Sequence, residues 1–363
     1  MALIVGVARE TAPGERRVAI TPETCRKFAA AGARVRLQRG AGSAAHFPDA
    51  AYGEAGAELV DDAQAALGDA GLVLCVQPPA AAAIATMAPG TCLVGMLQPD
   101  ADPARAAALR ERGIVAFPLE RLPRTTRAQA MDVLSSQAGM AGYKAVLLAA
   151  WLAPRFFPML TTAAGTIRPS KVLVVGAGVA GLQAIATAKR LGAQVEGFDV
   201  RPETREQIES LGGRFLDLGV SAVGEGGYAR ALDEEEKAEQ QRRLGEHLRG
   251  VDVVVCTAAV PGRPAPRILT TAMVEGMRPG SVVVDLAAES GGNCEATRPG
   301  ETVDHAGVTI AGPTGLAGTG AVHASEMYAR NLFNFASLLV RDGELVVDGD
   351  DELVAKTRWP PRD

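Results

Sequence analysis

The sequence predicts an α/β protein made of two doubly wound domains, each built on a parallel sheet. The chain has 363 residues, which exceeds the usual size of a single domain. Short apolar segments alternate with alanine-rich segments along most of this length, as expected for strands followed by covering helices. Aromatic residues make up only 4%, whereas there are 41 glycines, a composition that suits helices packed closely on sheets.

The first third of the chain predicts one such domain. Its expected strands are Ile4–Ala8, Val35–Gln38, Leu72–Val76, Cys92–Met96 and Val115–Pro118. A helix is expected to begin after Thr21, because an N-cap hydroxyl is followed by Pro22, and to stop near Gly32. From Arg127 to Leu152 an apolar pattern with few helix breakers predicts one extended helix that leads out of the domain.

A second series of elements begins after a turn at residues 167–170. Its expected strands are Lys171–Val175, Gln194–Phe198, Val251–Cys256, Val282–Asp285 and Val308–Ile310, with helices at Ala180–Leu191 and Pro202–Leu211. The charged segment 231–250 is expected to form a solvated surface helix. A final helix, about Ala321–Val340, is expected to cross back to the first domain.

This chain order predicts a discontinuous first domain, residues 1–134 with 320–363, around a continuous second domain, residues 135–319. Long crossing helices are expected to join the two domains, with a cleft between them. The net charge of −5 and the lack of a basic face argue against nucleic acid as a partner. The five cysteines form no CxxC pair, so reduced thiols are expected and no metal site. No apolar run approaches the roughly 20 residues that span a bilayer, so a soluble, cytoplasmic protein is expected.

The segment KVLVVGAGVAGLQAIATAKRLGAQVEGFDVR, residues 171–201, carries a dinucleotide-binding pattern. Gly176, Gly178 and Gly181 supply G-x-G-x-x-G between an expected strand and an expected helix, the Rossmann context that gives this motif its meaning. Asp199 ends the next strand, where a carboxylate can bind both ribose hydroxyls and favours NAD over NADP. Arg201 could instead accommodate a 2′-phosphate. The alternative is a glycine-rich turn without chemical role.

A second group of polar residues falls in LPRTTRAQAMDVLSSQAG, residues 122–139. It places guanidinium, amide, carboxylate and hydroxyl groups within about a dozen residues: Arg124, Arg127, Gln129, Asp132 and Ser135. One interpretation is a polar wall beside a bound nicotinamide. An ordinary helix start capped by Thr125 or Thr126 explains the spacing equally well.

These segments together resemble the NAD(H)-binding components of proton-translocating nicotinamide nucleotide transhydrogenases, in the alanine dehydrogenase/pyridine nucleotide transhydrogenase family. The resemblance runs nearly end to end, through ARETAPGERRVAITPE, HFPDAAYGEAGAEL, PRTTRAQAMDVLSSQ, the glycine fingerprint, AAVPGRPAP and VVVDLAAESGGNCE. It departs from the family within GPTGLAGTGAVHASEMYARN, which lacks the usual Asn and Pro-Ser-Arg, and in a shortened stretch between Phe215 and Tyr228.

The resemblance implies roles for particular residues. Asp132, held by Arg124 and Ser135, would bind the nicotinamide end, and Gln129 would reach towards the partner's nucleotide. The remaining residues implied to bind the cofactor are Ala130, Met131, Val179, Val200, Arg201 and Ala258, beside the fingerprint glycines and Asp199. Gly227 and Tyr228 resemble the tip of a mobile loop that closes over the nucleotide, although a plain turn explains those glycines too.

The implied function is hydride transfer from NADH to NADP⁺ carried by a partner subunit, coupled to proton translocation through a membrane-spanning subunit. A homodimer, held peripherally at the inner membrane by its partners, is also implied. The main alternative is an amino-acid dehydrogenase, which needs a cation and a proton donor. Gln77 and Gln98 stand where alanine dehydrogenases carry Lys and His, and Glu289 stands where they carry Asp. Arg17 occurs in both groups. A non-catalytic NAD(H)-binding protein is the second alternative.

Overall fold

The computed structural model describes residues 2–219, 233–260 and 262–361, and the chain forms two compact units. Unit 1 contains residues 1–137 and 317–363, and unit 2 contains residues 138–316. The division falls inside helix α6 (Val133–Leu152), and helix α11 (Ala321–Ala336) belongs to unit 1.

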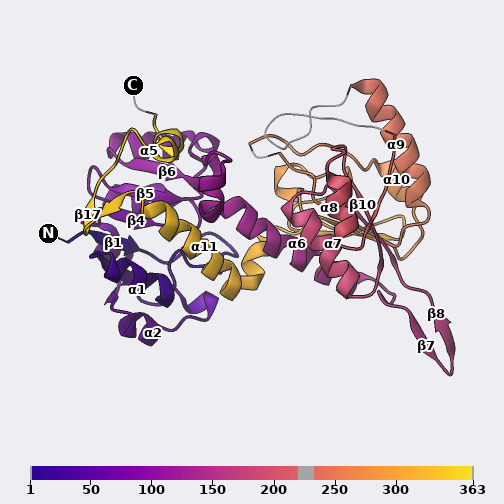
Figure 1. Cartoon of the computed structure of the whole chain (residues 1–363), viewed down its shortest axis with the longest axis horizontal. Coiled ribbons are helices and arrows are strands. Elements are labelled where there is room, and N and C mark those ends of the chain that lie inside the picture. Colours follow the sequence, from indigo (N-terminus) through magenta and orange to yellow (C-terminus); the bar gives the residue numbers. More distant parts are fainter. Residues whose placement is uncertain (1, 220–232, 261, 362–363) are drawn as a thin grey trace. The chain divides into compact units, whose positions relative to one another are not determined.

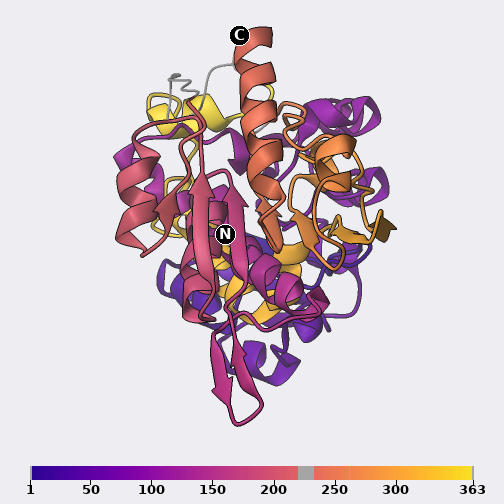
Figure 2. The same ribbon diagram turned by 90° about the vertical axis from the view of Figure 1, so that its right-hand side faces the viewer.

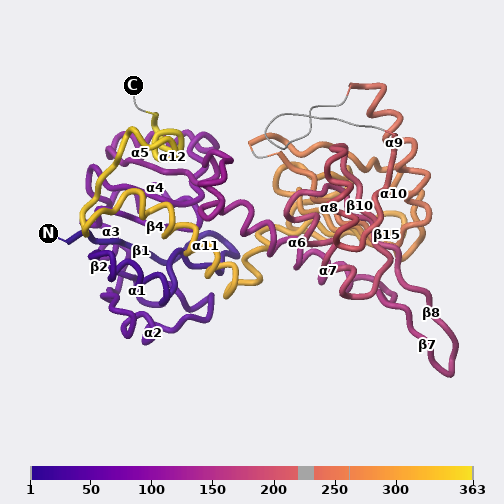
Figure 3. Tube along the Cα trace, in the orientation of Figure 1, coloured from indigo at the N-terminus to yellow at the C-terminus, as the bar shows by residue number. Residues whose placement is uncertain are grey.

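Unit 1 is built on a six-stranded parallel sheet in the order β3-β2-β1-β4-β5-β6 (Figures 1 and 3). The strands are β1 (Ile4–Val7), β2 (Arg34–Gln38), β3 (Glu58–Val60), β4 (Leu72–Leu74), β5 (Cys92–Gly95) and β6 (Val115–Pro118). Its helices are α1 (Pro22–Ala30), α2 (Asp49–Glu54), α3 (Ala63–Leu67), α4 (Ala81–Thr86), α5 (Pro103–Glu111), α11 and α12 (Glu352–Thr357). A short hairpin, β16 (Val340–Arg341) and β17 (Glu344–Leu345), follows α11.

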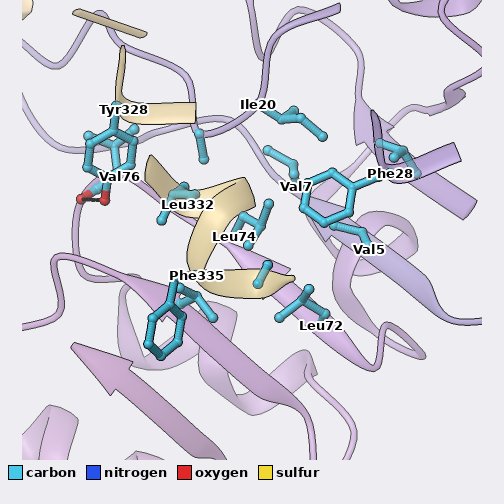
Figure 4. Close-up of a cluster of buried hydrophobic side chains, with 14 of the residues drawn as sticks. Val5, Val7, Ile20, Phe28, Leu72, Leu74, Val76, Tyr328, Leu332 and Phe335 are labelled. Carbon is cyan, nitrogen blue, oxygen red and sulfur yellow. Dashed lines mark hydrogen bonds between the residues drawn. The ribbon is translucent and has the colours of Figure 1, made fainter. Parts of the chain in front are cut away.

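The core of unit 1 joins the first and last parts of the chain. Tyr328, Leu332 and Phe335 of α11 lie against apolar side chains of β1 and β4 (Figure 4). The Tyr328 hydroxyl donates to the Cys75 carbonyl oxygen at 3.0 Å, so this aromatic ring is buried with its polar atom satisfied. Helix α11 is therefore an integral part of the core of the first sheet.

Unit 2 has a seven-stranded sheet in the order β11-β10-β9-β12-β13-β15-β14, with only β14 antiparallel to its neighbour (Figure 2). The strands are β9 (Lys171–Val175), β10 (Gln194–Phe198), β11 (Arg214–Phe215), β12 (Val253–Cys256), β13 (Val282–Asp285), β14 (Thr302–His305) and β15 (Val308–Ala311). Its helices are α7 (Val179–Arg190), α8 (Thr204–Ser210), α9 (Glu234–Leu248) and α10 (Thr271–Glu275). The predicted α/β class with two doubly wound parallel sheets is confirmed.

Three local features differ from the sequence predictions. The extended helix predicted from Arg127 is interrupted: residues Thr126–Met131 form a 3-10 helix, η4, and α6 begins only at Val133. An unpredicted hairpin, β7 (Leu160–Thr162) and β8 (Gly165–Ile167), projects from unit 2 with all its residues exposed (Figures 1 and 2). Helix α9 is charged as expected, but it also buries Leu244 and Leu248 against the sheet.

Candidate functional site

The glycine-rich turn of unit 2 follows β9 and leads into α7, as its spacing predicts. Gly176 has φ of +92°, a left-handed conformation that glycine adopts without strain. A Cβ atom on Gly181 would lie 1.8 Å from the Gly176 carbonyl oxygen, so any side chain there would push the helix off the strand. These two glycines are required by the protein's own packing.

Gly178 has a different environment. It is the N-cap residue of α7 and supplies no side-chain hydrogen bond to the first turn. A Cβ atom built on it would meet nothing within 4 Å, and the next residue, Val179, is 47% exposed. The positive end of α7 is thus reachable from solvent, and its backbone N–H groups fit the phosphates of a dinucleotide.

Asp199 stands just beyond β10 and is largely buried. Its carboxylate accepts hydrogen bonds from the Ala177 backbone N–H at 2.7 Å and from the Arg201 side chain at 2.9 Å (Nε) and 2.7 Å (Nη2). Burial acts to raise the pKa of this carboxyl, but the Arg201 and backbone hydrogen bonds outweigh it and hold the pKa below its ordinary value. Asp199 is therefore an ionised acceptor whose present partner is a guanidinium.

Ala258 follows β12, the strand beside β9, and is fixed by a side chain that the sequence did not single out. Asn293 is fully buried, and its amide donates to the carbonyl oxygens of Ala258 (2.7 Å) and Pro266 (2.9 Å). Its own side-chain oxygen accepts the Ala258 N–H at 3.0 Å. Asn293 lies in the GGNC segment that carried part of the family resemblance, but a hydrogen bond across 35 residues leaves no local pattern.

The polar loop of unit 1 contains the second group of predicted residues. Asp132 accepts from the Ser135 N–H at 2.9 Å and from its hydroxyl at 2.6 Å, which is the bonding of an N-cap. Capping by Thr125 is wrong, since that residue precedes η4 and makes no side-chain cap bond. Asp132 caps the N-terminus of α6, so the helix begins at Val133, later than predicted.

The other side chains of this loop are either exposed to solvent or packed against other parts of the protein. Arg124 and Gln129 are exposed, whereas Met131 is buried in the unit 1 core. Arg127 pairs with Asp351, the N-cap residue of α12, and so ties the loop to the C-terminal segment. The structure brings Asp132 and Ser135 into direct contact, and it leaves Gln129 accessible at the loop's surface.

A buried charge cluster, Glu10, Glu15, Arg17 and Gln77, lies beyond the ends of β1 and β4 in unit 1. Arg17 donates to Glu15 from Nε (2.8 Å) and Nη2 (2.6 Å), and from Nη1 to Gln137 (2.9 Å). Gln77 donates to the same Glu15 carboxylate at 2.8 Å. The Arg17 guanidinium is thus engaged by protein groups on each of its nitrogens.

The structure also bears on predictions about single residues, metal sites and membrane-spanning helices. Glu289 accepts the backbone N–H of Gly315 at 2.9 Å, within the segment that departs from the family. Gly227 and Tyr228 lie outside the described residues. Within the described ranges no cluster of three His, Cys, Asp or Glu side chains could hold a metal ion. A search of the same residues finds no helix long and apolar enough to cross a membrane.

Comparison with known proteins gives a consistent picture. Residues 6–141 match the N-terminal domain, and residues 145–358 the C-terminal domain, of the family described as alanine dehydrogenase/PNT. The chain is 43% identical to an NAD(P) transhydrogenase subunit alpha polypeptide of Rhodospirillum rubrum, over 97% of this chain and 95% of that one. A transhydrogenase structure from Sinorhizobium meliloti superposes with a TM-score of 0.89 at 42% identity, covering 98% and 97% of the two chains. An L-alanine dehydrogenase structure gives 0.81 at 27% identity, covering 98% and 94%.

Proposed function

The chain belongs to the alanine dehydrogenase/PNT family, and from this premise we propose that it is the NAD(H)-binding component of a proton-translocating transhydrogenase. Its similarity to transhydrogenase alpha subunits makes it a component of a transhydrogenase that uses a nicotinamide cofactor. The finer proposal is that hydride passes from NADH on this chain to NADP⁺ on a separate subunit, with coupled proton movement through a membrane-spanning subunit.

The observation that carries this proposal is that other protein groups bind the Arg17 side chain. A dehydrogenase of small amino or keto acids needs a cation for the substrate carboxylate and a proton donor for the reacting carbonyl. Each nitrogen of the Arg17 guanidinium donates a hydrogen bond to Glu15 or Gln137, and the side chain of Gln77 is neutral and donates to Glu15. Transfer between two nicotinamide rings requires no proton exchange, only close approach of the reacting carbons.

The residues of unit 2 fit a bound dinucleotide. We assign the pyrophosphate to the first turn of α7, where no protein atom lies within 4 Å of the Cβ position of Gly178 and Val179 offers its N–H. Gly176 forms the tight turn before it and packs against Ala258. Asp199, after β10, would accept from the ribose hydroxyls, with Val200 and Arg201 beside it. Ala258 follows β12, on the other side of β9. When bound, NADH supplies the hydride.

The loop of unit 1 is assigned the nicotinamide end. Its residues are Arg124, Gln129, Ala130, Met131, Asp132 and Ser135. The Asp132 carboxylate is already oriented by Ser135, and the exposed Gln129 amide is available to a partner's nucleotide. A lid formed by Gly227 and Tyr228 remains a prediction, because both lie outside the described residues.

Assembly with other subunits belongs to the same proposal. A partner would carry NADP(H), and a membrane-spanning partner would hold this chain peripherally at the inner membrane. A homodimer is supported by exposed apolar side chains in the β7–β8 hairpin and in the segment before it: Ile167 (45% exposed) in β8, and Phe156 (53%) and Met159 (64%) before β7.

Mixing the purified chain with an NADP(H)-binding component tests the proposal. We expect hydride transfer from NADH to an oxidised NADP analogue, and no NADH oxidation when pyruvate and ammonia replace the partner. Turnover with pyruvate and ammonia would instead establish the amino-acid dehydrogenase. Tight NADH binding without turnover under either condition would establish a non-catalytic nucleotide-binding protein.

A further inference from the structure

The three asparagines of the chain all donate hydrogen bonds to main-chain carbonyls of the two loops assigned to the cofactor. Asn293 holds Ala258 in unit 2. In unit 1, Asn331 and Asn334 of α11 converge on one acceptor, the carbonyl oxygen of Ala130, at 2.9 and 2.8 Å from their Nδ2 atoms. Two amides directed at one carbonyl fix the end of η4 in position and orientation.

The orientation of the Asn331 amide is itself determined. Its side-chain oxygen accepts from the Ser136 hydroxyl at 2.7 Å, so the nitrogen must face Ala130. Ser136 in turn accepts from the Gln137 amide at 3.2 Å, and that amide also donates to the Ala324 carbonyl. Asn331 is largely buried, and loss of its donor would leave part of the Ala130 carbonyl's bonding unmet.

We infer that Asn331 and Asn334 are positioning residues for hydride transfer. Ala130 lies between Gln129 and Asp132, and the last turn of a 3-10 helix leaves its carbonyls without partners inside the helix. The two amides supply those partners and thereby set where Gln129 and Asp132 stand. The inference rests on the proposed function, in which both residues act at the nicotinamide end.

Isosteric substitutions separate this role from general packing. Asn331→Asp keeps an acceptor for the Ser136 hydroxyl and replaces the donor to Ala130 by a second, negatively charged oxygen. Asn334→Leu removes the other donor without adding a charge, and Asn334→Gln retains an amide. Ser337→Ala is the matched control, because the Ser337 hydroxyl donates to the Phe333 carbonyl of its own helix at 2.8 Å.

The readouts are NADH affinity, thermal stability and steady-state transfer to the NADP(H)-binding partner. For Asn331→Asp/Asn334→Leu we expect kcat to fall about tenfold to a hundredfold, since small displacements of positioning groups have effects of that size. NADH affinity is expected to change by less than about threefold, because unit 2 holds most of the dinucleotide. Asn334→Gln should recover more of kcat than Asn334→Leu, and Ser337→Ala should match the unsubstituted chain.

Two outcomes overturn the inference. One is full kcat in the double variant. The other is a loss of kcat accompanied by an equal loss of NADH affinity and a collapse of the melting temperature. If the unsubstituted chain gave no transfer with its partner, the proposed function itself would fail, and the variants would show no contrast.

Discussion

The two sheets of this protein share the order of their first five strands and differ in which groups lie at the carboxyl ends of the two strands where that order reverses. In unit 2 the reversal lies between β9 and β12, and the glycine- and alanine-rich turn there leads into the N-terminus of α7. In unit 1 it lies between β1 and β4, and the Glu10 carboxylate accepts the N–H groups of Val76 (2.6 Å) and Gln77 (3.1 Å). Ligands of such folds bind beyond the carboxyl ends of the strands, at the point where the strand order reverses.

The difference teaches that strand order alone does not create a binding site. In unit 1 the backbone N–H groups of Val76 and Gln77 donate to a carboxylate of the protein. In unit 2 the Ala177 N–H likewise donates to Asp199, but the first turn of α7 has no side-chain cap at Gly178. The cluster around Arg17 then occupies the remaining polar positions. These unit 1 groups are bonded within the protein, whereas the proposed function assigns the turn of unit 2 to a cofactor.

The largest expected effect comes from removing the charge of Glu15. Both partners of the Arg17–Glu15 pair are about 5% exposed, so Glu15→Gln leaves a buried guanidinium without its carboxylate. We expect a loss of about 3–5 kcal/mol in the free energy of unfolding, measured by denaturant titration. Glu23→Gln is the matched control, since Glu23 pairs with Arg330 at the surface and should cost little. Equal effects of the two substitutions would contradict the comparison.

Substitutions of two glycines in unit 2 should distinguish a packing role from a nucleotide-binding role. Gly181→Ala places a Cβ 1.8 Å from a carbonyl oxygen, and overpacking of this kind costs about 3 kcal/mol, so both the melting temperature and NADH affinity should fall. Gly178→Ala meets no protein atom within 4 Å, so the melting temperature of the free chain should stay unchanged while NADH affinity falls. If Gly178→Ala bound NADH with unchanged affinity, the pyrophosphate would not bind at this turn.

The next effect concerns pH and the carboxyl group that fills the unit 1 edge. Burial raises the pKa of Glu10 to about 7, although the Val76 and Gln77 N–H groups and Arg17 oppose the rise. An unfolded Glu10 ionises near 4.5, so between about pH 4.5 and 7 the folded chain holds a proton that the unfolded chain has lost. This contribution to stability is complete below pH 4.5 and disappears as pH rises through 7.

Comparing the chain with its Glu10→Gln variant isolates that contribution. We expect the unsubstituted chain to lose up to about 3 kcal/mol relative to the variant between pH 5 and 7.5, from the size of the pKa change. Glu15 does not interfere, because its pKa is lowered and it stays ionised in both states across this range. Parallel stability curves for the two proteins would show that Glu10 does not hold a proton in the fold.

Whether the sequence alone predicts a feature depends on how far apart along the chain the interacting residues lie. Strands such as Lys171–Val175 and Val115–Pro118 were predicted to the residue, because a short apolar run between helical segments is a local signal. The β7–β8 hairpin was missed, since its exposed residues show no burial pattern. The sequence does not show what the Arg17 side chain contacts, and its hydrogen bonds to Glu15 and Gln137 are visible only in the structure. Asn331 is bonded to a carbonyl 201 positions away, which no local pattern could reveal.

The smallest expected effect tests the Arg201–Asp199 ion pair of unit 2. Arg201 and Asp199 resemble Arg17 and Glu15 in bonding, but the Arg201 side chain is 18% exposed against 5% for Arg17, so it can turn towards solvent. Asp199→Ser removes the acceptor for the ribose hydroxyls and releases Arg201 from its carboxylate. We expect NADH to bind about tenfold more weakly, the equivalent of one charged hydrogen bond.

NADPH should bind more tightly to Asp199→Ser than to the unsubstituted chain, because the arginine can then meet a 2′-phosphate. The gain should shrink as salt is raised, as expected for an exposed phosphate–guanidinium pair. Fluorescence titration of both nucleotides at two ionic strengths measures these changes, with Asp199→Ser/Arg201→Ala as the control that should lose the gain. If the single variant bound NADPH no better, Arg201 would be a fixed structural partner like Arg17, and the contrast between the two edges would rest on the glycines alone.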